Sequence, residues 1–248
     1  MMVLMKKSIL SKLLILFSIV GIIPLVAIAI YSYNKSREAL FINVRYDIEG
    51  DAKDIASSIS HLFNKARSDI LLLTVNPAFK RYFLEPEKKS FWLKELEKAF
   101  LYLSKIFPDS FDEGCYIISD GREICRVIFD KLAHPTELSI DETRNAFFAP
   151  TFTIPEGEVY QGPPYISTDT NRWVIPNSTP IVLPDGRKAA IAHMELNIAY
   201  LKSIMKNILQ EEVEEGFVMD KDGNIIVATW LDIKGEELFP KAVDIENS

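Results

Sequence analysis

Histidine and cysteine are scarce in this chain of 248 residues, which contains three of the first and two of the second. His61, His134 and His193 lie 73 and 59 residues apart, a spacing that does not suit paired metal ligands on one helix or strand. The motifs G-x-x-x-x-G-K-S/T, G-x-G-x-x-G, H-E-x-x-H and G-x-S-x-G are also missing. The sequence therefore predicts no metal, no cofactor and no enzymatic activity.

Basic side chains are outnumbered, with 28 Lys and Arg residues against 35 Asp and Glu residues. Lys6, Lys7 and Lys12 are the only charged residues among residues 1–33, so the other 215 residues carry 25 basic and 35 acidic side chains. Binding to nucleic acid requires a basic face for the phosphates, and the acidic balance provides none. We therefore exclude nucleic acid as a partner.

Only one apolar run is long enough to cross a membrane. It is LLILFSIVGIIPLVAIAIYSY, residues 13–33, and as a helix its 21 residues span roughly the 30 Å hydrocarbon core of a bilayer. We predict a single-pass protein of the cell (inner) membrane, with residues 1–12 as a cytoplasmic tail and the bulk of the chain extracytoplasmic. The alternative is a signal peptide cleaved near residues 27–29. The run exceeds the usual signal core of about 7–15 residues, which favours the membrane helix.

The apolar positions after this run recur in steps of three and four, at Leu40, Val44, Ile48, Ala52, Ile55, Ile59, Leu62, Ala66, Ile70 and Leu73. This period predicts one long helix that continues from the membrane run and ends before Asn76-Pro77. A narrow apolar stripe packs along a domain or along a second copy, so we expect a homodimer through this helix. A second amphipathic helix is expected at residues 87–106.

From Gly114 onward the apolar period becomes that of strands. The segments GCYIIS and EICRVIF flank Asp120-Gly121, a hairpin signal. Further strands are expected at residues 159–168, 173–182 and 189–196, followed by a helix at 198–210 and a second hairpin, FVMDKDGNIIVAT. Strands grouped together with helices at one end indicate an α+β fold with a mainly antiparallel sheet.

Cys115 and Cys125 lie on the two arms of the first hairpin, and two pairings remain open. A two-residue turn pairs Cys115 with Arg126, whereas a three-residue turn places the two cysteines opposite each other. A disulfide between Cys115 and Cys125 is compatible with the second register in an oxidising compartment, and two buried free thiols are the alternative.

The segment from Asp141 to Trp173 is rich in side chains that small-molecule pockets use. Its aromatic and charged residues include Arg144, Phe147, Phe148, Phe152, Tyr160, Tyr165, Asp169, Arg172 and Trp173. Aromatic walls with a few polar groups are typical of ligand pockets, and an arginine suits a carboxylate. The alternative is that these aromatics form the core beneath a long loop.

In order, these segments resemble the double Cache family of extracytoplasmic sensor domains, found in chemoreceptors, sensor histidine kinases and diguanylate cyclases. The resemblance rests on a membrane helix running into a long helix that breaks at LLLTVNPAFKRYF, on the hairpin YIISDGREICRVIF, and on TRNAFFAP, VYQGPPYIS, WVIPNSTPIVLPDGRKAAIAHMEL and GFVMDKDGNIIVAT. It implies a PAS-like antiparallel module at residues 34–210, distal to the membrane, and the start of a second, membrane-proximal module at residues 211–248. A lone hairpin packs poorly, so we expect the final segment to be weakly held.

The resemblance also implies ligand-binding positions in the distal module. They correspond to Arg144, Phe147, Phe148, Tyr165, Asp169, Trp173 and Glu195 in this chain. The amino-acid-binding subgroup of the family carries Arg-x-Trp-Tyr, whereas this chain has Arg144-Asn145-Ala146-Phe147-Phe148. The change removes an indole and a hydroxyl donor, so a less polar ligand or a small carboxylate held by Arg144 fits better than an amino acid.

We therefore expect a membrane-anchored sensor that binds a small molecule outside the cell and forms the N-terminal part of a larger receptor. One alternative is a signal-anchored extracytoplasmic enzyme that uses Glu195 or Asp169 as a general acid or base, although no nucleophile–base pair supports it. Another is a membrane adaptor that binds a partner receptor through the long helix and senses nothing itself.

Overall fold

A single helix opens the structure, which is a computed structural model that describes residues 9–209 and 215–230. This helix, α1, runs without interruption from Ile9 to Thr74 and includes Pro24. Near its N-terminal end it is long and apolar enough to cross a membrane. Asn76 then accepts a hydrogen bond from the backbone of Ala78 at 3.0 Å, which helps to start the next helix. The predicted continuity and end of the long helix are confirmed.

The chain divides into two compact units, residues 1–54 and residues 55–248. Within the first unit the apolar stripe of α1 is exposed, with 65% of Leu40, 47% of Val44 and 60% of Ile48 accessible to solvent. In the second unit the same stripe is buried, and Ala66 and Ile70 are fully inaccessible. The stripe therefore packs along a domain only over its second half.

Four further α-helices and nine strands follow α1 in the described residues. The helices are α2 (Ala78–Leu84), α3 (Lys89–Ile106), α4 (Phe148–Thr153) and α5 (Ile198–Ile208). The strands are β1 (Phe111–Ile118), β2 (Glu123–Ile128), β3 (Lys131–Leu132), β4 (Tyr160–Gln161), β5 (Tyr165–Ile166), β6 (Trp173–Val182), β7 (Lys188–Asn197), β8 (Phe217–Met219) and β9 (Ile225–Ala228). The expected α+β architecture is confirmed.

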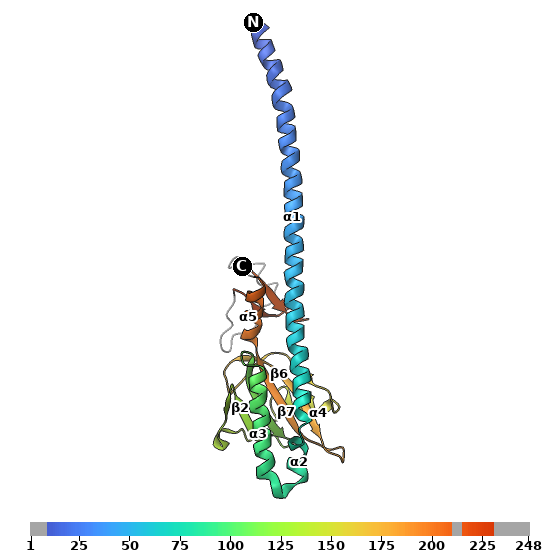
Figure 1. The fold of residues 1–248 in the computed structure, drawn as a ribbon, viewed down its shortest axis with the longest axis vertical. Coiled ribbons are helices and arrows are strands. Elements are labelled where there is room, and N and C mark those ends of the chain that lie inside the picture. Colours follow the sequence, from blue (N-terminus) through green and yellow to red (C-terminus); the bar gives the residue numbers. More distant parts are fainter. Residues whose placement is uncertain (1–8, 210–214, 231–248) are drawn as a thin grey trace. The chain divides into compact units, whose positions relative to one another are not determined.

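One antiparallel sheet of seven strands organises the second unit. Its order is β3-β2-β1-β7-β6-β4, and β5 also pairs with β6. The long strands β1, β7 and β6 form the centre, and α3 packs on β1 and β2 (Figure 1). Because side chains alternate across a strand, this sheet has two distinct faces.

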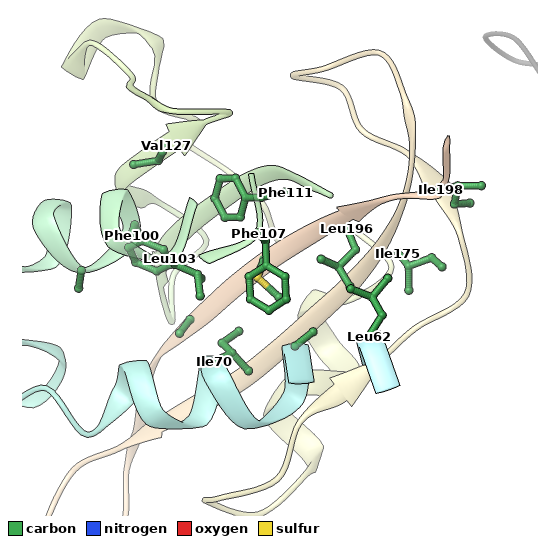
Figure 2. Close-up of a cluster of buried hydrophobic side chains, with 14 of the residues drawn as sticks. Leu62, Ile70, Phe100, Leu103, Phe107, Phe111, Val127, Ile175, Leu196 and Ile198 are labelled. Carbon is green, nitrogen blue, oxygen red and sulfur yellow. The ribbon is translucent and has the colours of Figure 1, made fainter. Parts of the chain in front are cut away.

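The face toward the helices carries the main hydrophobic core. Leu62 and Ile70 of α1 face Phe107, and Leu196 of β7 lies beside them (Figure 2). Tyr116 of β1 is fully buried here, and its hydroxyl donates a 2.5 Å hydrogen bond to the backbone oxygen of Phe79. The tyrosine therefore ties the centre of the sheet to α2.

The continuous strand expected at residues 159–168 does not form. Only Tyr160–Gln161 and Tyr165–Ile166 pair with β6, and Gly162-Pro163-Pro164 separates them. Proline has no backbone N–H and a fixed φ, so it cannot continue a ladder of hydrogen bonds. The result is an irregular edge rather than a full strand.

The register of the first hairpin excludes the disulfide. Cys115 pairs with Arg126 and Tyr116 pairs with Cys125, so the two cysteines occupy opposite faces of the sheet. Both are buried free thiols. Gly121 has φ +91° in the turn, and a Cβ there would lie 2.7 Å from the Thr143 methyl group, so this turn position requires glycine.

The second hairpin, β8 and β9, forms at the predicted place. The backbone of Asn224 and its side-chain amide both donate to the Asp220 carboxylate, at 2.9 and 2.7 Å. Ile226 and Val227 of β9 belong to the main core, so the expectation of weak packing is wrong for this strand. Residues 231–248, on which the same expectation falls, lie outside the described residues.

Candidate functional site

The sheet face that looks away from α1 and α3 carries an unusual set of polar side chains, and all of them except Tyr165 and Asp169 are buried. We call it the polar cluster, and its members are Glu113, Cys115, Glu123, Arg126, Tyr165, Asp169, Ser178, His193 and Glu195. The central members lie on neighbouring strands because Cys115 of β1 pairs with Arg126 of β2 and with His193 of β7, which in turn pairs with Ser178 of β6. A bulge in the β1–β2 ladder brings Glu123 opposite Ile117, so its side chain joins the same face.

Arg126 organises one half of the polar cluster. Its Nη1 atom lies 3.2 Å from the Glu123 carboxylate and 2.6 Å from the Asp169 carboxylate. Its Nη2 atom donates to the backbone oxygen of Glu137, while its Nε atom has no hydrogen-bond partner among the described residues. Glu123 also accepts a 2.8 Å hydrogen bond from the backbone of Ser139. One buried cation thus fastens the loop after β3 and the loop after β5 to the sheet.

His193 and Glu195 organise the other half. Ser178 Oγ lies 2.7 Å from His193 Nδ1, and the opposite ring atom, Nε2, lies 3.6 Å from the Glu195 carboxylate. The Tyr165 hydroxyl donates a hydrogen bond to Glu195 Oε1 and lies 3.4 Å from His193 Nε2. Burial, followed by the charge of Glu195, raises the pKa of Tyr165, so this hydroxyl keeps its proton.

Aromatic side chains cover this half of the cluster. The Phe147 ring stacks on the His193 ring with centroids 3.8 Å apart, and it packs with Cys115 and Phe148 in a second, smaller apolar cluster. Lys188 fixes the end of the α4 segment by donating to the backbone oxygens of Phe152 and Ile154, at 2.6 and 2.7 Å. The loop aromatics are therefore seated on the sheet by specific contacts.

Glu113 lacks the partners that the other carboxylates have. It is 3% exposed, and its Oε2 atom has no hydrogen-bond partner among the described residues; the same holds for Oε2 of Glu195, its neighbour on β7. Burial, followed by the charge of Glu195, raises the pKa of Glu113 well above its ordinary value. Burial likewise raises the pKa of Cys115 well above that of a free thiol. Such groups need a proton or a positive partner.

Three members of the polar cluster also present potential metal ligands. One side-chain atom each from Glu113, Cys115 and Glu123 lies within 4.8 Å of the other two, and all three residues are buried. Carboxylate oxygen and thiolate sulfur are both ligands of Zn²⁺. The expectation of no metal site considered only cysteine and histidine spacing, and it did not consider this grouping.

The sequence-predicted site residues separate into two groups. Phe147, Phe148, Tyr165 and Glu195 lie together, and Asp169 joins them through Arg126. Arg144 is exposed on the preceding loop, where its charge contributes to the lowered pKa of Asp141 after the hydrogen bonds from Thr143. Trp173 is half-buried against the main core on the other face of the sheet.

Sequence reasoning missed Glu113, Glu123, Arg126 and Ser178, and it left His193 open between a pocket residue and an ordinary sheet residue. A signal was present for one of them. Arg126 is a charged residue between the apolar Cys125 and Val127 of a strand, and a charged residue at such a position is rarely buried without a partner. The residues that lie beside each of these side chains on the neighbouring strands depend on the register, and the sequence did not provide the register.

No protein-family model matches this chain, and no curated protein matches it. Solved structures do. The sensor domain of the Vibrio cholerae histidine kinase DctB has a TM-score of 0.59 and 9% identity over 86% of this chain and 76% of its own. The ligand-binding domain of the Campylobacter jejuni chemoreceptor Tlp3, in complex with L-valine, has a TM-score of 0.56 and 15% identity over 72% of this chain and 68% of its own.

A further match is the extracellular domain of the histidine kinase vpHK1S-Z8, with a TM-score of 0.51 and 16% identity over 69% of this chain. The chain spans 60% of the length of that domain. All three structures are sensory domains of receptors or kinases rather than catalytic domains. Together with the long N-terminal helix, the antiparallel sheet and the loop-covered polar face, they show that this chain has the fold of the Cache-type extracytoplasmic sensor domains.

Proposed function

We propose that this chain is a membrane-anchored extracytoplasmic sensory module that binds a small molecule over the polar cluster and passes the signal along α1. The observation that carries the proposal is the pair of buried carboxylate oxygens without partners, on Glu113 and Glu195, on the sheet face against which Phe147 and Tyr165 also pack. A buried polar atom without a hydrogen bond costs free energy, and a ligand can supply the missing partner.

The fold supports this placement. The domain of Tlp3 is described in complex with L-valine, and a second structure of the same domain has isoleucine bound. Ligand binding between a sheet and its covering loop fits a face where Phe147 and Tyr165 provide apolar walls and Glu195 provides a polar group. Arg144, which is exposed, would have to turn inward to hold a carboxylate of the ligand.

The two faces of the sheet provide a route for the signal. On β7, His193 and Glu195 belong to the polar cluster, whereas Met194 and Leu196 belong to the main core, to which Ile70 of α1 also contributes. A shift of β7 on ligand binding would therefore reach the helix directly through packed side chains, because interiors are close-packed. The helix continues to the apolar segment that we propose as the membrane anchor.

Thermal-shift measurements on the full chain in detergent would test binding. The panel would contain amino acids, small carboxylates, alkylammonium salts and neutral alcohols. A ligand at 100 times its dissociation constant stabilises the folded state by about 2.7 kcal/mol, which corresponds to about 5–10 °C in a protein of this size.

Arg144→Ala tests the role that the family resemblance implies for this residue, and Arg187→Ala, at an exposed turn beside Asp185, is the matched control. We expect Arg144→Ala to weaken binding of a carboxylate ligand and Arg187→Ala to leave it unchanged. If no compound in the panel changes the melting temperature, the proposed function is wrong.

The membrane assignment has its own test. We expect the chain to stay in the membrane fraction after a carbonate wash, with an intact mass that includes residues 1–33. A soluble product that has lost residues up to about 29 would identify the apolar segment as a cleaved signal peptide. A reporter fused after Ser248 that is active only outside the cytoplasm would support the proposed orientation.

A further inference from the structure

Glu113 has charged neighbours of its own sign on both sides. It is the direct neighbour of Glu195 in the β1–β7 ladder, and Glu123 lies across the sheet within the group of potential metal ligands. Like charges opposite each other on a sheet are destabilising, and burial strengthens their repulsion. The arrangement is costly unless something positive, or a proton, enters it.

Arg126 makes no ion pair with Glu113, and its charge offsets only part of the effect of burial and of the neighbouring carboxylates on the pKa of Glu113. Its Nη1 atom is shared between Glu123 and Asp169, its Nη2 atom donates to the Glu137 backbone, and its Nε atom has no acceptor among the described residues. His193 uses Nδ1 with Ser178 and turns Nε2 toward Glu195. Among the ion pairs of the described residues, none therefore includes Glu113.

The surroundings of Glu113 suit a cation in two ways. Toward β2, the ligand atoms of Glu113, Cys115 and Glu123 lie within 4.8 Å of one another, and this set suits a divalent ion such as Zn²⁺. Toward β7, the unpartnered oxygens belong to Glu113 and Glu195, which are paired on neighbouring strands, and Tyr165, whose ring packs with that of Phe147, donates to the other oxygen of Glu195. Paired carboxylates beside aromatic faces suit an organic ammonium group.

We propose that Glu113 is the anionic centre of a cation-binding site on the polar face of the sheet. The ligand chemistry is a positively charged group, supplied by a divalent metal ion or by the ammonium group of a small organic molecule. A site for an ammonium group rests on the proposed sensory function, whereas a site for a metal ion does not. Cys115 would contact only the metal ion, and Glu195 would contact only the ammonium group.

Isothermal titration of the full chain in detergent, after treatment with a chelator, tests the site with two probes, zinc chloride and butylammonium chloride. We expect at least one to bind with a 1:1 stoichiometry. Glu113→Gln should weaken that binding by about 30-fold or more, because the ligand loses its buried charged partner. Glu87→Gln, at an exposed position between α2 and α3, is the control and should leave the affinity unchanged.

Two further variants separate the sources. Cys115→Ser should abolish zinc binding and retain butylammonium binding, and Glu195→Gln should do the reverse. Glu113→Asp keeps the charge on a shorter side chain, so it should bind with intermediate affinity even if Glu113→Gln is poorly folded. Melting curves of all variants show whether each is folded before titration.

Two results would overturn the cation site. The first is that neither probe binds the wild-type chain, and the second is that a cation binds Glu113→Gln as tightly as wild type. If the first result comes with a neutral or anionic ligand from the thermal-shift panel that binds wild type and Glu113→Gln equally, the cation site is wrong and the proposed sensory function stands, so the two proposals fail separately.

Discussion

The ring of Phe147, from the loop before α4, stacks on the imidazole of His193 in β7, with centroids 3.8 Å apart and an interplanar angle of 14°. Phe147 is 2% exposed and His193 is 1% exposed, so the contact closes this part of the polar cluster from water. The contact also joins the loop, where ligand-binding residues were expected, to β7. On the other face of the sheet, side chains of β7 belong to the main core.

Phe147→Ala should destabilise the module by about 3–5 kcal/mol, because it leaves a cavity over His193 and Cys115. Urea denaturation monitored by circular dichroism measures the loss. Phe91→Ala is the matched control, since Phe91 is 53% exposed on α3, and its cost should be about 1 kcal/mol or less. Equal losses for the two variants would contradict the burial of Phe147.

The thiols give a second prediction. In the folded wild-type chain neither Cys115 nor Cys125 should react with a maleimide, because both are buried, and both should react after denaturation without prior reduction. Phe147→Ala should expose Cys115 selectively, since only this cysteine packs against Phe147, while Cys125 lies in the main core. Mass spectrometry of the labelled peptides distinguishes them. A requirement for reductant before labelling would reveal a disulfide instead.

Stability should fall as the pH rises from about 4.5 to about 8. Burial raises the pKa of Glu123 from 4.5 to about 7, against the opposing effects of the Ser139 hydrogen bond and Arg126. The folded state therefore holds a proton that the unfolded chain has released, so the contribution is complete below pH 4.5 and is lost as the pH passes through 7. Burial also raises the pKa of Asp112, to about 6, which adds to the same slope.

Glu123→Gln should flatten this pH dependence, because an amide does not titrate, and the difference should be on the order of 1–3 kcal/mol across this range. Melting temperatures between pH 4.5 and 8 provide the measurement. Glu158→Gln, at an exposed position, should retain the wild-type slope. A Glu123→Gln curve parallel to that of wild type would show that Glu123 titrates normally.

The exposed half of the apolar stripe gives a prediction about self-association. Leu40, Val44 and Ile48 form one face of α1 and are exposed, so we expect them to pack against a second copy in the membrane-embedded protein. Val44→Cys should form a disulfide-linked dimer under mild oxidation. Lys35→Cys, nine residues or two and a half turns away, lies on the opposite side of the helix and should cross-link poorly. Equal cross-linking at both positions would argue against a dimer through this face.

Several elements could be read directly from the residues. The apolar run and the step of three and four residues predicted one helix ending before Asn76-Pro77, because helical periodicity and the restriction before proline are local properties. The Asp120-Gly121 turn was predictable for the same reason, since it requires positive φ. The strand at residues 159–168 failed because two adjacent prolines outweighed an apolar pattern.

The candidate site was predictable only in its loop residues. Phe147, Phe148 and Tyr165 are conspicuous in sequence because aromatic residues gather in one segment, and Glu195 came from the family resemblance. Glu113, Glu123 and Arg126 lie on strands where the direction of each side chain depends on a register and on a bulge. Trp173 belonged to the same segment, yet alternation along β6 turned it toward the main core.

The sequence by itself determined the long helix, the positions of the two hairpins, the central strands and the acidic balance, because these follow from composition and from contacts between near neighbours. The tertiary structure decided which face each side chain occupies. The register between β1 and β2 places Cys115 and Cys125 on opposite faces, and the register between β1 and β7 places Glu113 beside Glu195. The turn between β1 and β2 fixes the first of these registers. Hydrogen bonding between β1 and β7, which are far apart in the chain, fixes the second, and with it the charge of the site.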